Sequence, residues 1–204
     1  MNPIELGQKY DRIAHWWHEQ HGDSDYGVAQ FGKALGFVTN TGTALDVGCG
    51  TGGRFVRVLE KWGFTITGLD ISDEMITLAE VHHPEHRFFQ ADICCWDTRE
   101  RFDFIFAWDS IFHLPYEMHK PVVSKMCDML NPGGVLMYSF GDAEGEHTDT
   151  WLEDTFYYSS IGINENLKLL MANGLSVLHL ELDQYPEKHV YVIARKPEPA
   201  LMEA

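Results

Sequence analysis

A run of glycines between two apolar segments is the clearest chemical signal in the sequence. Gly48 to Gly53 reads Gly-Cys-Gly-Thr-Gly-Gly, after the apolar segment 43–47 and before apolar residues at helical spacing. Glycines between a strand and a helix let the backbone approach a ligand at the positive end of the helix. Asp70 follows Gly50 by twenty residues and ends the next apolar segment, where a carboxylate can accept both hydroxyls of a ribose. The pattern predicts a nucleoside site.

Two further acids distinguish between the nucleoside ligands NAD and S-adenosylmethionine. Asp46 lies two residues before Gly48. A carboxylate there suits the positively charged amino-acid end of S-adenosylmethionine, but it would repel the pyrophosphate of NAD. Asp92 follows the third apolar segment, where it could accept from an adenine amino group. These acids favour S-adenosylmethionine, and an NAD-dependent oxidoreductase is the less favoured alternative.

The elements that position these residues predict an α/β fold with a parallel sheet. Strand-like and helix-like segments alternate, which indicates helices on both faces of the sheet. The expected strands are 43–47, 65–70, 87–90, 102–108 and 135–140, and the expected helices are 54–61, 72–81, 115–130 and 164–173. Two last strands, 176–183 and 189–194, are joined by a link too short for a helical crossover and must be antiparallel.

Four segments, taken in order, resemble the class I S-adenosylmethionine-dependent methyltransferases. They are Leu45–Gly52, Leu69–Met75, Gln90–Ile93 and Asn131–Gly134, and Phe102–Pro115 resembles the small-molecule branch of that family. The resemblance extends from residue 10 to residue 196. It implies a three-layer, Rossmann-like fold with seven strands in the order 3-2-1-4-5-7-6 and strand 7 antiparallel. One domain, 1–204, would comprise a helical cap (1–42, with a helix expected over 10–19), a cofactor-binding core (43–140), an acceptor-site loop (141–163) and a final helix and hairpin (164–196).

The resemblance also implies which residues hold the cofactor, S-adenosyl-L-methionine, and its product S-adenosyl-L-homocysteine. They are Tyr10, Asp46, Gly48, Cys49, Gly50, Asp70, Ile71, Met75, Asp92, Ile93 and Trp108. The glycines would meet the methionine part, and Asp70 would hold the ribose. Ile71 and Met75 would flank the adenine, whose edge Asp92 and the Ile93 N–H would bind. Tyr10 would cover the cofactor, and the Trp108 carbonyl would lie near its amino group.

Two residues after the fourth strand are candidates for contact with the acceptor. Methyl transfer needs a base only if the acceptor arrives protonated, because the sulfonium is already activated. His113 is the candidate base, and the alternative is a structural histidine that closes a turn. Asp109 is a candidate substrate contact or a helix cap. With Asp142 it would offer a metal two carboxylates but no third oxygen ligand, so we expect no metal.

Histidines and aromatic residues gather in two places outside these motifs. The segment His15-Trp16-Trp17-His18 with His21 could in principle bind a metal, but an amphipathic lid helix whose tryptophans pack on the sheet is the better interpretation. His82 and His83 precede a proline and are expected to be solvated. The aromatic run 151–158 would supply one wall of the acceptor pocket or pack in the core.

Composition limits the partners of this chain. Lys and Arg number 15 against 31 Asp and Glu, for a net charge of −16, which disfavours nucleic acid and anionic membrane surfaces. No apolar segment reaches the roughly 20 residues of a membrane span. Four cysteines without a C-x-x-C pair predict reduced thiols and a cytoplasmic location. We expect a methyltransferase with a small-molecule acceptor, as a monomer or homodimer, and a non-catalytic nucleoside-binding protein of the same fold is the alternative.

Overall fold

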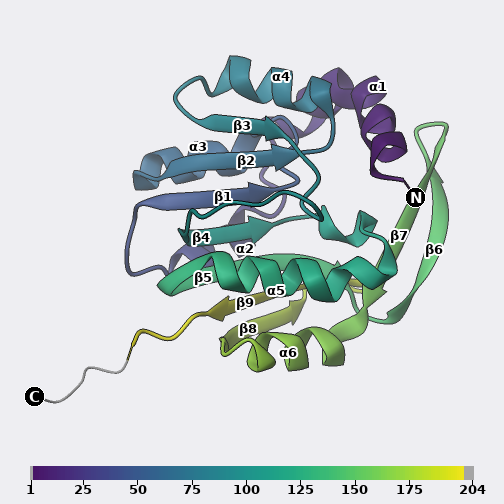
Figure 1. Ribbon diagram of the computed structural model, residues 1–204. Coiled ribbons are helices and arrows are strands. Elements are labelled where there is room, and N and C mark those ends of the chain that lie inside the picture. Colours follow the sequence, from purple (N-terminus) through teal and green to yellow (C-terminus); the bar gives the residue numbers. More distant parts are fainter. Residues whose placement is uncertain (1, 200–204) are drawn as a thin grey trace, which may run out of the picture.

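The structure, a computed structural model, describes residues 2–199 and contains a seven-stranded sheet between two layers of helices (Figure 1). The strand order is β3-β2-β1-β4-β5-β9-β8. The strands are β1 (Thr43–Val47), β2 (Thr65–Asp70), β3 (Arg87–Gln90), β4 (Phe102–Ala107), β5 (Leu130–Gly141), β8 (Ser176–Leu182) and β9 (His189–Arg195). The first five pair in parallel, and β9 pairs antiparallel with both β5 and β8. The predicted fold class, strand order and antiparallel last strand are confirmed.

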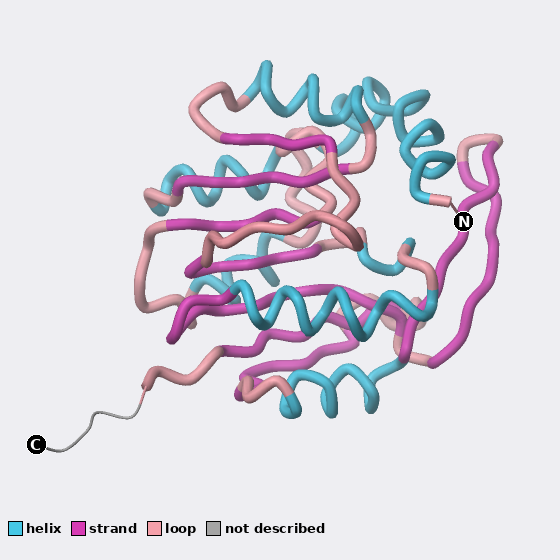
Figure 2. The backbone as a smooth tube through the Cα atoms, viewed as in Figure 1, coloured by secondary structure: helices cyan, strands magenta, loops and turns pink. Residues whose placement is uncertain are grey.

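Helices cover both faces of this sheet (Figure 2). They are α1 (Pro3–His21), α2 (Val28–Leu35), α3 (Gly53–Trp62), α4 (Asp73–His82), α5 (His119–Met129) and α6 (Gly162–Ala172). Side chains of α2 and α3 share one buried cluster with alternate residues of the central strands, and side chains of α5 share the other. Because both faces of the sheet are buried, its central strands are apolar at nearly every position.

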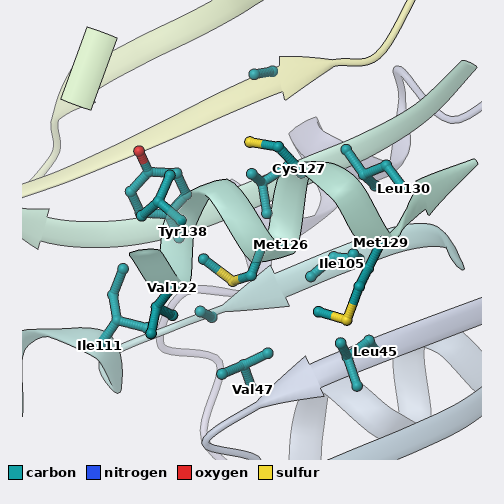
Figure 3. Close-up of a cluster of buried hydrophobic side chains, with 14 of the residues drawn as sticks. Leu45, Val47, Ile105, Ile111, Val122, Met126, Cys127, Met129, Leu130 and Tyr138 are labelled. Carbon is teal, nitrogen blue, oxygen red and sulfur yellow. The ribbon is translucent and has the colours of Figure 1, made fainter. Parts of the chain in front are cut away.

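Strand β4 illustrates how alternation divides the core. Phe104 and Phe106 pack with α2 and α3, whereas Ile105 and Ala107 pack with α5. Figure 3 shows the α5 side, where Met126 points from the helix toward the strands. The two clusters fix the sheet from both sides, and the carboxyl ends of β1, β2 and β4 are left for a site.

The helix expected from Pro115 begins later than predicted. Two short 3₁₀ turns, η1 (Ile111–His113) and η2 (Tyr116–Met118), precede α5. Leu114 between them is extended, with φ −61° and ψ 148°, as expected for a residue that precedes proline. The chain after β4 therefore passes along the sheet edge before α5 begins. This path brings Asp109 and His113 to the carboxyl end of the sheet.

Residues 141–163 form a hairpin rather than an irregular connection. Strands β6 (Glu144–Trp151) and β7 (Asp154–Ile161) make a separate two-stranded sheet, which stands at the right side of the molecule in Figure 1. Leu152 and Glu153 form its turn, with φ of 47° and 65°. Two-residue turns with positive φ usually contain Asn and Gly, so Leu-Glu gave no turn signal. The exposed, polar β6 likewise lacked the alternation of a strand.

The N-terminal region contains more helix than predicted. The helix expected over 10–19 extends to Pro3–His21, and the Asn2 side chain accepts from the Ile4 N–H at 3.0 Å to begin it. Helix α2 was not predicted. Helix α1 contacts α4 along its length and meets the tip of the β6–β7 hairpin, where Trp16 and Trp151 pack with ring centroids 5.5 Å apart. Across residues 2–199 no helix combines the length and hydropathy that a bilayer crossing requires.

Candidate active site

One cavity lies at the carboxyl ends of β1, β2 and β4, beneath α1. It encloses about 1230 Å³ with its open mouth included. Every residue predicted from the sequence lines it: Tyr10, Asp46, Gly48, Cys49, Gly50, Asp70, Ile71, Met75, Asp92, Ile93, Trp108, Asp109 and His113. Residues separated by a hundred positions in the chain thus meet at one site. None of residues 141–163 is part of this lining, so the acceptor-site role of that segment stays a prediction.

The glycine loop, Gly48–Gly53, directly follows β1 and packs closely against β2 and the segment after β4. The N–H groups of Gly48 and Cys49 both donate to the Leu69 carbonyl, at 2.8 and 2.9 Å. Gly48 has a φ of 77°, and a Cβ built there would come within 2.2 Å of the Ser110 Cβ. Only glycine fits that position. The close approach leaves backbone, not side chains, facing the cavity at the N-terminal end of α3.

Asp70 joins the glycine loop to the end of β2. Its two oxygens accept from the N–H groups of Gly50 at 2.8 Å and Ser72 at 2.9 Å. Burial raises the pKa of Asp70, and those backbone N–H bonds act in the opposite direction. Each carboxylate oxygen retains a second lone pair for a ligand hydroxyl. Asp70 therefore fixes the loop and can also bind a ribose.

Asp46 is a buried carboxyl at the start of the loop. It is 3% exposed, and burial, followed by the charge of Asp70, raises its pKa well above the usual range. The nearby Arg54 guanidinium opposes this shift, but no ion pair within 4 Å joins Asp46 to any of residues 2–199. A positively charged ligand group beside Asp46 would restore its ionised form.

The opposite end of the cavity is apolar except for Asp92. The Asp92 Oδ1 accepts from the Cys94 N–H at 2.8 Å. Ile93 is buried, and Pro3 and Leu6 of α1 line the same cavity. Because β1, β2 and β3 are neighbours in the sheet, Asp46, Asp70 and Asp92 follow one another along its carboxyl edge and line one cavity.

Tyr10, which is half-buried, and the buried His113 form a hydrogen-bonded pair in the cavity lining. The Tyr10 hydroxyl lies 2.7 Å from the His113 Nε2, and the His113 Nδ1 lies 2.8 Å from the Tyr157 carbonyl. Because a carbonyl only accepts, Nδ1 carries the proton and Nε2 accepts from Tyr10. Burial lowers the pKa of His113 to about 4 and raises the pKa of Tyr10. Both side chains are therefore uncharged near neutral pH.

Asp109 lies at the end of β4 in a left-handed conformation, with φ 52°. Its Oδ1 lies 2.8 Å from the His189 Nε2 and accepts from the Ser139 hydroxyl at 3.1 Å. The His189 Nδ1 lies 2.5 Å from Asp183 Oδ1. The side chain caps no helix, since the 3₁₀ turn that follows has no side-chain cap. His189 was not predicted, because only the pairing of β9 with β5 brings it to β4.

The lining also includes residues that the sequence analysis did not assign: Trp17, His21, Arg54 and Ser110. The expectation that the tryptophans of α1 pack on the sheet is wrong, since Trp17 lines the cavity and Trp16 is 38% exposed against Trp151. The sequence signal available for Trp17 was its place in α1, the helix predicted to act as a lid. Nothing in the spacing distinguished Arg54 from other charged residues at helix starts.

The expectation of a solvated His83 is also wrong. His83 is buried, and its Nδ1 lies 2.9 Å from the Glu60 Oε1. A Cβ at Gly52 would come within 2.8 Å of this ring, so the glycine loop makes room for it. Within residues 2–199 no three His, Cys, Asp or Glu side chains are grouped so that they could hold a metal ion.

Comparisons with known proteins agree on one family. Residues 44–134 match the model described as "Methyltransferase domain". The trans-aconitate 2-methyltransferase of Escherichia coli O157:H7 is 36% identical over 119 residues, 57% of this chain and 43% of the relative. That of Rhizobium rhizogenes is 32% identical over 120 residues, 58% of this chain and 46% of the relative. The matched part is thus less than half the length of these curated relatives.

Solved structures resemble nearly the whole chain. The DhpI–SAH complex has a TM-score of 0.71 and 23% identity, and it covers 96% of this chain and 97% of its own. Magnesium protoporphyrin IX methyltransferase from Synechocystis PCC 6803 with bound SAM has a TM-score of 0.70 and 18% identity, with coverage of 96% and 98%. At these identities the likeness concerns the fold.

Proposed function

We propose that this chain is a class I S-adenosylmethionine-dependent methyltransferase and that it transfers a methyl group from S-adenosylmethionine to a small-molecule acceptor. One observation carries the proposal. Asp46, Asp70 and Asp92, each at the end of its own strand, line a single cavity with the glycine loop. Their order along that cavity fits a cationic amino-acid end, a ribose and an adenine.

The binding roles follow from the contacts of each residue. Asp46 would pair with the positively charged end of the cofactor, which compensates its burial. Asp70 would accept from the ribose hydroxyls with the lone pairs that Gly50 and Ser72 leave free. Asp92 would accept from the adenine amino group. Tyr10 would cover the cofactor from α1.

S-adenosylmethionine supplies an activated methyl group, so the chain must orient the acceptor, exclude water and remove any acceptor proton. Helix α1 covers the cavity and excludes water. Tyr10 can take a proton from the acceptor at its hydroxyl oxygen while it passes its own proton to His113 Nε2. The Tyr157 carbonyl holds His113 in the tautomer that this transfer requires. His113 therefore acts through Tyr10, as a positioning residue and proton acceptor.

The acceptor is a small molecule in this proposal. The net charge of −16 opposes binding of nucleic acid. The curated relatives carry the name of trans-aconitate, which makes that compound a necessary member of any acceptor panel. The rival oxidoreductase would need to place the NAD pyrophosphate near Asp46, whose buried carboxyl disfavours an anion.

Calorimetric titration with S-adenosylhomocysteine, with NADH as the comparison ligand, tests this function. We expect micromolar binding of S-adenosylhomocysteine and none of NADH. Asp70→Asn should weaken S-adenosylhomocysteine binding by about 1–3 kcal/mol, through loss of charge-assisted hydrogen bonds to the ribose. Asp97→Asn, at an exposed position outside the cavity, serves as the matched control. Binding of NADH, or of neither ligand, would refute the cofactor assignment, and binding without turnover on any acceptor would favour the non-catalytic alternative.

A further inference from the structure

The Asp109 side chain lines the cavity on the β4 side, next to the glycine loop. Asp109 follows β4, which pairs with β1, and the next residue, Ser110, donates to the Val47 carbonyl at 2.5 Å beside the glycine loop. The Asp109 side chain is 21% exposed and lines the cavity. The Ser139 and His189 contacts both end on Oδ1, and the Tyr26 hydroxyl also hydrogen-bonds to the Asp109 side chain. Because a carboxylate offers about four acceptor positions, one is left for a ligand.

Two strands, β5 and β9, hold this carboxylate. His189 of β9 contacts Oδ1, and Ser139 of β5 both donates to Oδ1 and accepts from the Asp109 N–H at 2.7 Å. Asp183, whose side chain is 2% exposed, contacts the other His189 nitrogen and accepts from Gln30 at 2.9 Å. The carboxylate is thus fixed in position before any acceptor arrives.

His189 lies between two carboxyl groups, those of Asp109 and Asp183. Burial lowers the pKa of His189, but its hydrogen bonds and charge interactions with Asp109 and then Asp183 outweigh burial, so its pKa is raised. Asp109 gives the cavity lining a fourth acidic side chain besides Asp46, Asp70 and Asp92. Around Asp109 lie Tyr10, His21, Tyr26, Arg54 and His113, whose pKa values all respond to its charge.

The cavity offers little positive charge to oppose this. Of the lining residues among 2–199, Asp46, Asp70, Asp92 and Asp109 are acidic, and only Arg54 carries a permanent positive charge. The Arg54 guanidinium already donates to the Tyr26 carbonyl at 2.6 Å and the His21 carbonyl at 3.3 Å. Burial, and secondly Arg54, lower the pKa of His21, and burial lowers that of His113. Both imidazoles are neutral near pH 7.

From this arrangement we propose that Asp109, held by His189, binds a hydrogen-bond donor group of the acceptor, so that the acceptor is an amine- or hydroxyl-bearing molecule and not a polycarboxylate. The inference rests on the proposed function, and it names the acceptor class of that site. Asp109 contacts the acceptor, whereas His189 and Asp183 act through Asp109 as positioning residues. A tricarboxylate, by contrast, would place several negative charges beside Asp109 with Arg54 as its only partner of opposite charge.

The test uses the full chain saturated with S-adenosylhomocysteine and ligand-observed NMR. The probes are a panel of small primary amines, a matched panel of alcohols and phenols, and trans-aconitate with tricarballylate. We expect compounds from at least one of the two donor panels, the amines or the alcohols and phenols, to bind. We expect no binding of trans-aconitate or tricarballylate. Asp109→Asn should weaken the bound probes at least tenfold and leave S-adenosylhomocysteine affinity unchanged, since asparagine also tolerates positive φ. Asp97→Asn should change neither.

Variants of His189 separate positioning from a general effect on folding. His189→Gln can still donate to Asp109 and should retain most probe binding, whereas His189→Leu should lose at least tenfold. In wild type the His189 imidazole should titrate above its ordinary pKa, and Asp109→Asn should lower that value. Absence of S-adenosylhomocysteine binding would refute the proposed function and this inference together. If S-adenosylhomocysteine binds, any of three results would refute this inference alone. They are a preference for the tricarboxylates, no binding of any donor probe, and probe affinity that Asp109→Asn leaves unchanged.

Discussion

At the scale of single residues, the Tyr10–His113 pair couples the lid helix to the sheet edge through one hydrogen bond of 2.7 Å. The His113 Nε2 can accept a proton only while the ring is neutral. Since burial lowers its pKa to about 4, the ring is neutral above about pH 5 and becomes protonated as the pH falls through that value. The pair is therefore ready to accept a proton throughout the physiological range.

Turnover should accordingly be independent of His113 titration from about pH 6 to about pH 8, and it should fall below about pH 5. His113→Gln can keep bonds to Tyr10 and Tyr157 but has no proton to gain, so it should lose this acid limb. Its turnover at pH 7 should drop by about 10²-fold or more, the usual contribution of a positioned base. The measurement is the pH dependence of kcat for both proteins. An acid limb that persists in His113→Gln would assign the titration to another group.

Some site residues could be predicted from the sequence, and others could not. Asp46, Asp70 and Asp92 could be predicted because each lies within two residues of the end of a strand. His189 could not, because it lies 80 residues from Asp109 and meets it only through the β5–β9 pairing. The buried state of His83 depends on the space that Gly52 leaves, which spacing does not encode.

At the scale of elements, α1 and the β6–β7 hairpin hold each other in place over the cavity. Trp151 packs between Trp16 and Trp17, with ring centroids 5.5 and 5.9 Å away, and Asp154 pairs with Arg12 and Lys9. Aromatic pairs contribute about 0.5–1.5 kcal/mol each beyond the area they bury. The surface ion pair with Arg12 adds less. Trp151 therefore makes two of the aromatic contacts between the two elements, and Tyr10 makes another with Phe156.

Trp151→Ala should release α1 from the hairpin. Loss of two aromatic pairs, about 1–3 kcal/mol, corresponds to roughly 10- to 100-fold faster amide hydrogen exchange in α1. Exchange in β1 and β4 should stay unchanged. S-adenosylhomocysteine affinity should fall, because Tyr10 and Trp17 of α1 line the cavity. Hydrogen-exchange mass spectrometry measures the effect, with Thr148→Ala, an exposed change on β6, as control. Equal α1 exchange in wild type and Trp151→Ala would show that the hairpin does not stabilise the lid.

Elements with strong local signals could be predicted and those without could not. Helix α4 begins at its Ser72 cap, which accepts from the Met75 N–H as the sequence indicates. The hairpin was missed because its turn is Leu-Glu and its outer strand is polar throughout. Helix α5 was placed too early because Pro115 suits a first helical turn, while its effect on Leu114 extends the chain there instead.

At the scale of the whole molecule, the sheet order brings the glycine loop, Asp70, Asp92 and Asp109 to one edge. Parallel strands connected by helices align their carboxyl ends at one edge of the sheet. In the order 3-2-1-4-5, the connections from β1 lead one way to β2 and β3, whereas β4 and β5 lie on the other side, so a crevice opens between β1 and β4. The sequence could predict this edge because each strand is apolar and each connection has a clear helix. The net charge of −16 is also a property of the whole molecule, and it opposes the binding of anionic partners.

The position of His189 on β9 has a consequence for how the protein is made. The residues proposed to hold the cofactor all lie before residue 113 in the chain. His189, which contacts Asp109, lies on β9, and β9 enters the sheet between β5 and β8. Synthesis proceeds from the N-terminus, so the residues proposed to hold the methyl donor leave the ribosome before the residue proposed to fix Asp109. In the proposed scheme, selection of the acceptor therefore depends on the last strands to be made.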